Sequence, residues 1–259
     1  MKLPKRIMQR LWRAIIEFEL LAPGDRVLVG LSGGKDSAFL LYSLAILRED
    51  SSLPFELSAI HVDHGFTDYY DILPMNQLCE QLGVQFFVRR TNIYKAAFNH
   101  ATQNPCAHCS YLRRGFINNF AREERFNKVA LAHHLDDAVE TFLMSQIYSG
   151  QLKTFEPSSY LDRTKITVIR PLVYFREKEI MKALNYIEYT PVETPCPLAG
   201  KSKRTFVKEL IRELCTDNKF AFNNLTAAMR KGSKLQRWPA ALEKNDLHRK
   251  ILKFWQMVP

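Results

Sequence analysis

Short apolar runs alternate with longer amphipathic segments along most of this chain. The apolar runs predict buried strands at 26–31, 57–63, 84–89, 128–132 and 166–169. The segments between them predict helices at 38–44, 70–82, 94–102, 106–125 and 135–148. Strands that alternate with helices are typical of a mostly parallel sheet covered on both faces. We therefore expect an α/β fold, a doubly wound and Rossmann-like sheet.

The N-terminal segment is basic and amphipathic. Its apolar stretch at 11–21 is interrupted by Arg13, Glu17 and Glu19, so it predicts a helix over 1–24 rather than a signal peptide. No apolar stretch approaches the roughly 20 residues that a membrane span needs. We expect no membrane partner.

The pattern changes after Glu177, where the chain becomes helical and basic. One apolar stripe is predicted there, made of Phe206, Val207, Leu210, Ile211 and Leu214. We expect the main domain to span 25–200 and a basic helical region to span 201–259. Trp238 and Trp255 could pack on the body of the protein or on a second subunit.

The composition adds a partner class. The chain has 259 residues, 46% of them hydrophobic, and a net charge of +10. The basic residues cluster at 89–90, 113–114, 201–204 and 230–237. This surplus favours a polyanion such as RNA, although a basic surface that only aids solubility is also compatible with it. Five cysteines without a secretory signal indicate a reducing, cytoplasmic setting.

The loop after the first predicted strand is the clearest chemical signal. It reads Ser32, Gly33, Gly34, Lys35, Asp36, Ser37. Glycines between a strand and a helix let backbone N–H groups approach a phosphate, and the serines and lysine add donors. The loop matches neither of the commoner phosphate-binding patterns.

Two further polar groups follow predicted strands. His61 and Asp63 end one strand, and His133 and Asp137 lie at the junction of another strand with its helix. In a parallel sheet these residues meet the loop at Ser32 on one edge, where ligands bind. Capping explains one or two of these polar residues but not all of them. A carboxylate beside phosphates favours a Mg²⁺ site at Asp137.

Three cysteines form the third candidate group. Cys106 and Cys109 make a CxxC pair, and Cys196 lies between two prolines. Three thiolates fit a [4Fe–4S] cluster with one iron that lacks a protein ligand, whereas zinc with His108 as fourth ligand is the alternative. Cys79 and Cys215 are interpreted as core residues.

Taken together, these motifs resemble those of a known enzyme family. The segments 32–37, 106–115, 132–141 and 170–172, with Cys196, resemble the tRNA 2-thiocytidine synthetases. These are iron–sulfur-dependent enzymes of the PP-loop ATP pyrophosphatase superfamily. The resemblance implies an adenine nucleotide alpha hydrolase-like fold, with ATP, Mg²⁺ and a [4Fe–4S] cluster as cofactors.

The resemblance also implies a reaction. The C2 oxygen of a cytidine, at position 32 of the tRNA anticodon loop in this family, attacks the α-phosphate of ATP. Sulfide on the open iron then displaces AMP. The implied partners are tRNA, a sulfur donor such as a cysteine desulfurase, and a second copy in a homodimer.

The resemblance assigns a role to each matching residue. The catalytic residues are Lys35, Asp36 and Asp137. The ATP-binding residues are Ser32, Gly33, Gly34, Lys35, Asp36, Ser37, His61, Asp63 and His133. The cluster ligands are Cys106, Cys109 and Cys196, and the RNA-binding residues are Arg113, Arg114, Lys203 and Arg204.

Alternatives remain at this point. A 2-thiouridine synthetase would show the same cluster chemistry, although the paired CxxC zinc ribbons of those relatives are missing. A tRNA(Ile) lysidine synthetase shares the loop and needs no cysteine triad. A non-catalytic ATP-binding regulator and a zinc-stabilised RNA-binding protein are the rivals from other classes.

Overall fold

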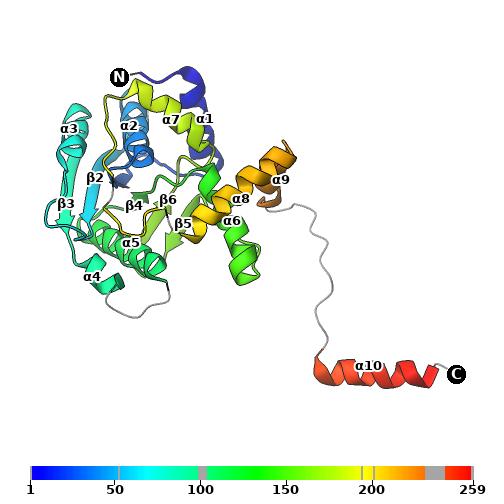
Figure 1. The fold of residues 1–259 in the computed structure, drawn as a ribbon. Helices are drawn as coiled ribbons and strands as arrows, with labels where there is room; N and C mark the ends of the chain where they lie inside the picture. Colours follow the sequence, from blue (N-terminus) through cyan, green and yellow to red (C-terminus); the bar gives the residue numbers. More distant parts are fainter. Residues whose placement is uncertain are drawn as a thin grey trace. The chain divides into compact units, whose positions relative to one another are not determined.

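A six-stranded sheet forms the centre of the protein (Figure 1). The computed structural model describes residues 2–51, 53–98, 104–193, 195–200, 202–230 and 243–257. The strand order is β3-β2-β1-β4-β6-β5. The strands are β1 (Arg26–Gly30), β2 (Glu56–Asp63), β3 (Gln85–Arg90), β4 (Lys128–Ala130), β5 (Ser158–Leu161) and β6 (Ile166–Ile169). All pairings are parallel except that of β5 with β6, which confirms the expected mostly parallel sheet.

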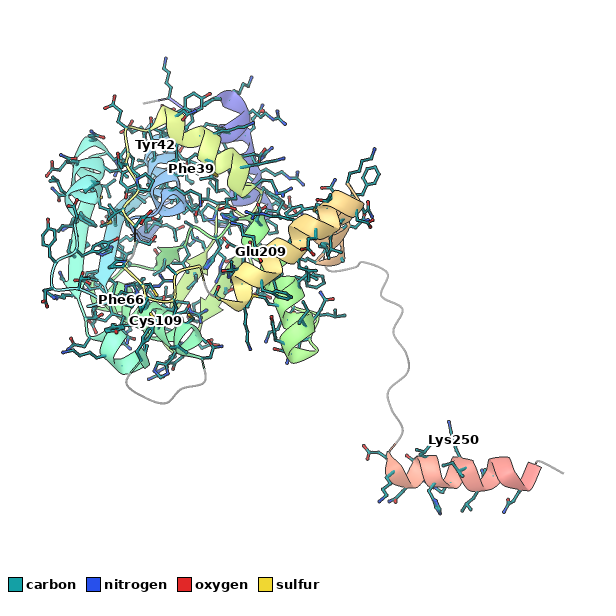
Figure 2. All side chains as sticks on the ribbon, in the orientation of Figure 1. Phe39, Tyr42, Phe66, Cys109, Glu209 and Lys250 are labelled. Carbon is teal, nitrogen blue, oxygen red and sulfur yellow. The ribbon has the colours of Figure 1, made fainter. Side chains whose placement is uncertain are left out.

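Helices cover both faces of the sheet, as expected for a doubly wound fold. The larger core gathers residues of α1 (Lys5–Glu17), α2 (Lys35–Asp50), α3 (Leu73–Gln81) and α7 (Glu177–Ala183). The opposite face is covered by α4 (Ile93–Phe98) and α5 (Pro105–Glu123). Helix α2 is buried on nearly every side, so that both Phe39 and Tyr42 lie in the core (Figure 2).

A smaller helical layer follows the sheet. It contains α6 (Leu135–Ser149), α8 (Lys203–Asp217) and α9 (Ala221–Ala228), whereas the short 3₁₀ turn η1 (Leu184–Tyr186) follows α7. Val207 and Ile211 of α8 pack against Val139 of α6. The predicted stripe is therefore right at its centre but wrong at its ends, because Phe206 and Leu214 are exposed. Helices α6 and α9 pack against α8, and together they bury only a narrow strip of it.

Strand β5 was absent from the sequence-based expectation. Its residues read SSYL and lie on the sheet edge, where one row of backbone groups faces no neighbour and apolar patterning is weak. The structure describes Ile93–Phe98 of the predicted helix at 94–102 as helical, and residues 99–103 lie outside the described residues. The assignment of Cys79 to the core is confirmed, whereas Cys215 of α8 is only partly buried, against the apolar cluster that joins α8 to α6 and α9.

The chain divides into two compact units, Met1–Met229 and Arg230–Pro259. The first includes α1, whose Leu11 belongs to the larger core. In the second, the structure describes helix α10 (Lys244–Met257). Trp238 and the side chain of Trp255 lie outside the described residues. No helix in the described part of the chain is long and apolar enough to cross a membrane.

Candidate active site

The loop from Ser32 to Ser37 is closed by its own hydrogen bonds. The backbone N–H of Ser32 donates to Ser37 Oγ at 3.1 Å, and Ser37 Oγ donates to the Gly34 carbonyl at 2.9 Å. Gly33 has φ +89°, and a Cβ there would lie 2.9 Å from the Tyr70 hydroxyl. Only glycine fits this backbone and this contact without strain. The loop therefore presents its N–H groups at the start of α2.

A cavity of about 220 Å³ opens beside this loop. Ser32, Gly34, Asp36 and Ser37 line one side, and His133 follows β4. Arg113 and Arg114 of α5 close the other side, over a floor formed by Gly30, Ile60, Val62 and Leu131. The structure thus brings the predicted loop, His133 and two predicted RNA-binding arginines to one edge of the sheet. An anion at the loop would have positive charge on its opposite side.

Lys35 is held at the loop by a carboxylate from α7. Its Nζ lies 3.0 Å from Asp36 Oδ2 and 3.1 Å from Glu177 Oε1. Glu177 also accepts from Lys208 Nζ at 2.5 Å. Burial raises the pKa of Glu177, but the two lysines outweigh burial and hold that pKa at about 2. Glu177 carries no motif, so sequence reasoning missed it.

His61 lies in a smaller cavity beside Ser32 that Asp63 and Tyr70 also line. Its Nδ1 is 3.0 Å from the Leu31 carbonyl, and its ring stacks on Tyr70 with centroids 5.0 Å apart. Its Nε2 is buried without a hydrogen-bond partner. Asp63 accepts from the Gly65 N–H at 2.8 Å and so shapes the turn after β2. The two residues flank the loop as predicted.

His133 is a neutral imidazole against an aromatic ring. Its centroid is 5.1 Å from that of Phe155, and its Nδ1 is buried without a hydrogen-bond partner. Burial lowers the pKa of His133 to about 4, although Asp137 opposes that shift. At neutral pH this ring can donate a hydrogen bond to a ligand or accept one from it, but it adds no charge.

Asp137 has two structural partners. One oxygen accepts from the His134 N–H at 2.9 Å in a capping box that starts α6, which confirms the predicted polar cap. The other oxygen is 3.1 Å from Arg204 Nη1, which also lies 3.1 Å from Glu140 Oε2. Burial raises the pKa of Glu140, and Asp137 adds to the rise. The roles of Asp137 with Mg²⁺ and of Arg204 with RNA stay predictions.

Asp36 offers a freer carboxylate oxygen than Asp137. Its Oδ2 accepts from Lys35, but its Oδ1 is buried without a hydrogen-bond partner. His134 Nε2 lies 3.9 Å from this Oδ1. An oxygen in this position suits a hard divalent cation beside phosphates. Among the described residues, no three of His, Cys, Asp and Glu lie close enough to hold a metal ion.

The three predicted cluster cysteines are free thiols at the same end of the protein. Cys106 is exposed on the first turn of α5, and Cys109 lies one turn on, partly buried (Figure 2). Burial raises the pKa of Cys106, and the nearby Cys196 raises it further. Burial also raises the pKa of Cys109, and the charge of Arg113 opposes that rise. The three unpaired thiols are close enough to interact, since Cys196 adds to the rise in the pKa of both other thiols, and Arg113 lies beside them. Iron would displace their protons, so this set of donors fits a thiolate-bound iron–sulfur cluster.

A segment after η1 joins the cysteines to the loop. The Tyr189 hydroxyl donates to the Gly33 carbonyl at 2.7 Å, and the Val192 N–H donates to the same oxygen at 2.9 Å. Cys196 follows Val192 by four residues. We call residues 187–196, apart from Thr194, the strap. No sequence pattern indicated that the strap contacts the loop.

Comparison with known proteins agrees with this geometry. A family model described as the PP-loop domain matches residues 5–214. The tRNA-cytidine(32) 2-sulfurtransferase of Citrifermentans bemidjiense is 37% identical over 228 residues, covering 86% of this chain and 89% of that relative. That of Alcanivorax borkumensis is 36% identical over 236 residues, covering 88% and 81%. The chain belongs to this PP-loop family.

Solved structures support the fold of this PP-loop protein. The U34-tRNA thiolase NcsA from Methanococcus maripaludis, solved with its [4Fe–4S] cluster, superposes with a TM-score of 0.69 at 23% identity. The match covers 86% of this chain and 77% of that chain. The NMN synthetase from Francisella tularensis superposes with a TM-score of 0.50 at 16% identity, covering 92% and 100%. The adenine nucleotide alpha hydrolase-like fold is confirmed.

Proposed function

We propose that this protein is an ATP-dependent tRNA sulfurtransferase that converts a cytidine to 2-thiocytidine. Its curated relatives carry this activity in their names, at position 32 of tRNA. The observation that carries the proposal is the double hydrogen bond from the strap to Gly33. It ties a phosphate-binding loop to the segment that supplies Cys196, so nucleotide chemistry and thiol chemistry share one edge of the sheet.

The loop performs the first step by charge and positioning. The N–H groups at the start of α2 and the ammonium of Lys35 stabilise the negative charge that develops on the ATP phosphates. Lys35 is already oriented by Glu177, which keeps its own negative charge. The C2 oxygen of cytidine then forms a bond to the α-phosphorus, and pyrophosphate leaves with the electron pair of the broken bond.

Other residues prepare the same step. Asp36 Oδ1 is the oxygen we assign to Mg²⁺, in preference to the doubly engaged Asp137. His133 stays neutral and can hydrogen-bond the nucleotide without repelling a cation. Arg113 and Arg114 lie across the cavity, where they can balance the phosphate charge.

Cys106, Cys109 and Cys196 are the residues that would hold a [4Fe–4S] cluster. When bound, that cluster would present sulfide from a donor to the activated carbon, and AMP would leave with the oxygen that was on C2. The three thiols lie on two separate segments, and the strap sets the position of the third. A cysteine desulfurase as sulfur donor, a homodimer and a cytoplasmic location belong to this proposal.

Reconstitution tests the proposal. The full chain, purified without oxygen, is incubated with unmodified tRNA, ATP, Mg²⁺, sulfide and a reductant, and the nucleosides are analysed by mass spectrometry. We expect 2-thiocytidine together with AMP and pyrophosphate, and none of them with Lys35→Ala. Lysidine or 2-thiouridine in place of 2-thiocytidine would assign the chain to another PP-loop activity. ATP binding without pyrophosphate release would indicate a regulator.

A further inference from the structure

A second, larger cavity adjoins the nucleotide cavity. Its volume is about 620 Å³, and it shares Arg114, Ile117 and Leu131 with the cavity beside the loop. A cavity of this size accommodates a ligand as large as a nucleotide. The reaction proposed above assigns nothing to it.

Strand alternation builds the floor of this cavity. Residues two apart face the same side of a sheet, and the cavity is lined by Val129 and Leu131, by Val168 and Arg170, and by Ser159 and Leu161. Ser159 pairs with Val168 in the antiparallel register. Residues of α5 form the facing wall. We call this cavity the α5–β6 groove.

The groove combines arginines with apolar walls. Arg114, Arg163 and Arg170 line it, and no carboxylate from the described part of the chain does. Tyr111 and Phe116 add aromatic rings from α5, and Tyr111 is 65% exposed. Aromatic faces and guanidinium groups are the usual partners of splayed RNA bases and their phosphates. The lining thus favours an anion with a flat, partly apolar body.

Two buried polar atoms in the lining have no hydrogen-bond partner. Arg170 is only 7% exposed, and its Nε has no partner, although its Nη1 donates to the Glu156 carbonyl at 2.6 Å. Thr164 is 8% exposed, and its Oγ1 also has no partner. Unsatisfied buried donors are costly, so such groups indicate a ligand that would satisfy them.

We propose that the α5–β6 groove receives the RNA nucleotide that is to be modified. The inference rests on the proposed function, because the acceptor base must reach the α-phosphate beside the loop. The base lies at the Leu131 end, which the groove shares with the nucleotide cavity. The ribose and its phosphate run toward Arg163, and the Nε–H of Arg170 donates to an acceptor of the ligand.

Adjacent serines on β5 provide a matched pair of variants. Ser159 lines the groove, whereas Ser158 alternates to the opposite face of the sheet. Ser159→Trp therefore fills the groove, and Ser158→Trp makes the same change outside it. Both residues are partly exposed on an edge strand, where a larger side chain is tolerated best.

The experiment uses the full chain with its cofactor loaded and α,β-methylene-ATP bound. Binding is measured for cytidine 5′-monophosphate and for an anticodon stem-loop RNA, together with thiolation of that RNA. We expect Ser159→Trp to weaken both bindings about tenfold or more, the scale of losing a stacked base. Its affinity for α,β-methylene-ATP should stay unchanged, and Ser158→Trp should resemble the wild type.

Equal binding by Ser159→Trp and Ser158→Trp would overturn the inference. The inference would also be overturned if the RNA did not compete with cytidine monophosphate for binding, because the groove would then bind only free nucleotides. If Ser159→Trp fails to fold, Arg163→Ala, an exposed change, must still weaken both bindings. Loss of binding in Ser159→Trp while wild-type protein thiolates no RNA would support the groove and defeat the proposed function. Full thiolation of the RNA by Ser159→Trp would support the proposed function and overturn the assignment of the groove.

Discussion

The hydroxyl of Tyr189 donates a 2.7 Å hydrogen bond to the carbonyl oxygen of Gly33. The two residues are separated by 156 positions in the sequence. Gly33 belongs to the loop that faces the phosphates, and Tyr189 belongs to the strap that leads to Cys196. This bond makes the shape of the nucleotide loop depend on the segment that carries a cluster ligand.

Tyr189→Phe removes that bond and leaves the ring in place. We expect ATP to bind about fivefold more weakly, since one net hydrogen bond contributes about 1 kcal/mol. The Val192 N–H still holds Gly33, so the fold should persist. Equilibrium titration with a fluorescent ATP analogue measures the change. Tyr186→Phe, on an exposed side chain, is the control. Equal affinities in the two variants would remove the strap from nucleotide binding.

Stability should fall as the pH drops from about 6.5 to about 4. His64 and His133 have folded-state pKa values of about 4, for which burial is the largest cause, against 6.5 as the ordinary value. Over that window the unfolded chain binds protons that the folded chain does not, so stability rises with pH. Denaturant unfolding at a series of pH values measures the slope, and His133→Gln should reduce it. An unchanged slope would show that His133 titrates normally.

Arg204 should matter more for folding than Lys203, its neighbour on α8. Arg204 neutralises Asp137 and the buried Glu140, whereas Lys203 lies over the Tyr148 ring on the surface. Arg204 is itself partly exposed, so we expect Arg204→Ala to cost about 1–3 kcal/mol of stability. Lys203→Ala should instead weaken tRNA binding, and the affinity for tRNA should then fall less steeply with salt.

Glu140→Gln tests whether the ion pair between Arg204 and Glu140 explains this loss of stability. The change removes the charge that Arg204 compensates, so Arg204→Ala combined with Glu140→Gln should regain part of the stability that Arg204→Ala loses. Additive losses in denaturant unfolding would show that the contact between Arg204 and Glu140 contributes nothing.

Cys196→Ser should lose iron and acid-labile sulfide while ATP still binds. The thiol lies on the strap, but the strap is held at the loop through Tyr189 and Val192 rather than through the sulfur. Cys215→Ser is the matched control, since Cys215 of α8 packs against the apolar cluster that joins α8 to α6 and α9. Iron assay and ATP titration on oxygen-free preparations give the two readouts. Iron retained in Cys196→Ser would exclude that residue as a ligand.

The sequence predicted the residues whose neighbours along the chain already reveal their setting. Ser32, His61 and His133 each follow an apolar run, and the carboxyl ends of parallel strands must meet at one edge. The cap on α6 was readable for the same reason, since His134 and Asp137 are three residues apart.

Contacts between distant segments were not readable. Glu177 pairs with Lys35, and Tyr189 bonds Gly33, only because the chain after β6 returns across the loop. Arg204 belongs to a basic run, and only the packing of α8 on α6 places it against carboxylates. Strand β5 is defined by its antiparallel register with β6, which its own four residues do not encode.

Nucleoside mass spectrometry on total tRNA from cells with and without this gene tests the central claim most directly. The account predicts that 2-thiocytidine is present in the parent, absent from the deletion strain, and restored by the wild-type gene but not by Lys35→Ala. Unchanged 2-thiocytidine in the deletion strain would contradict the account.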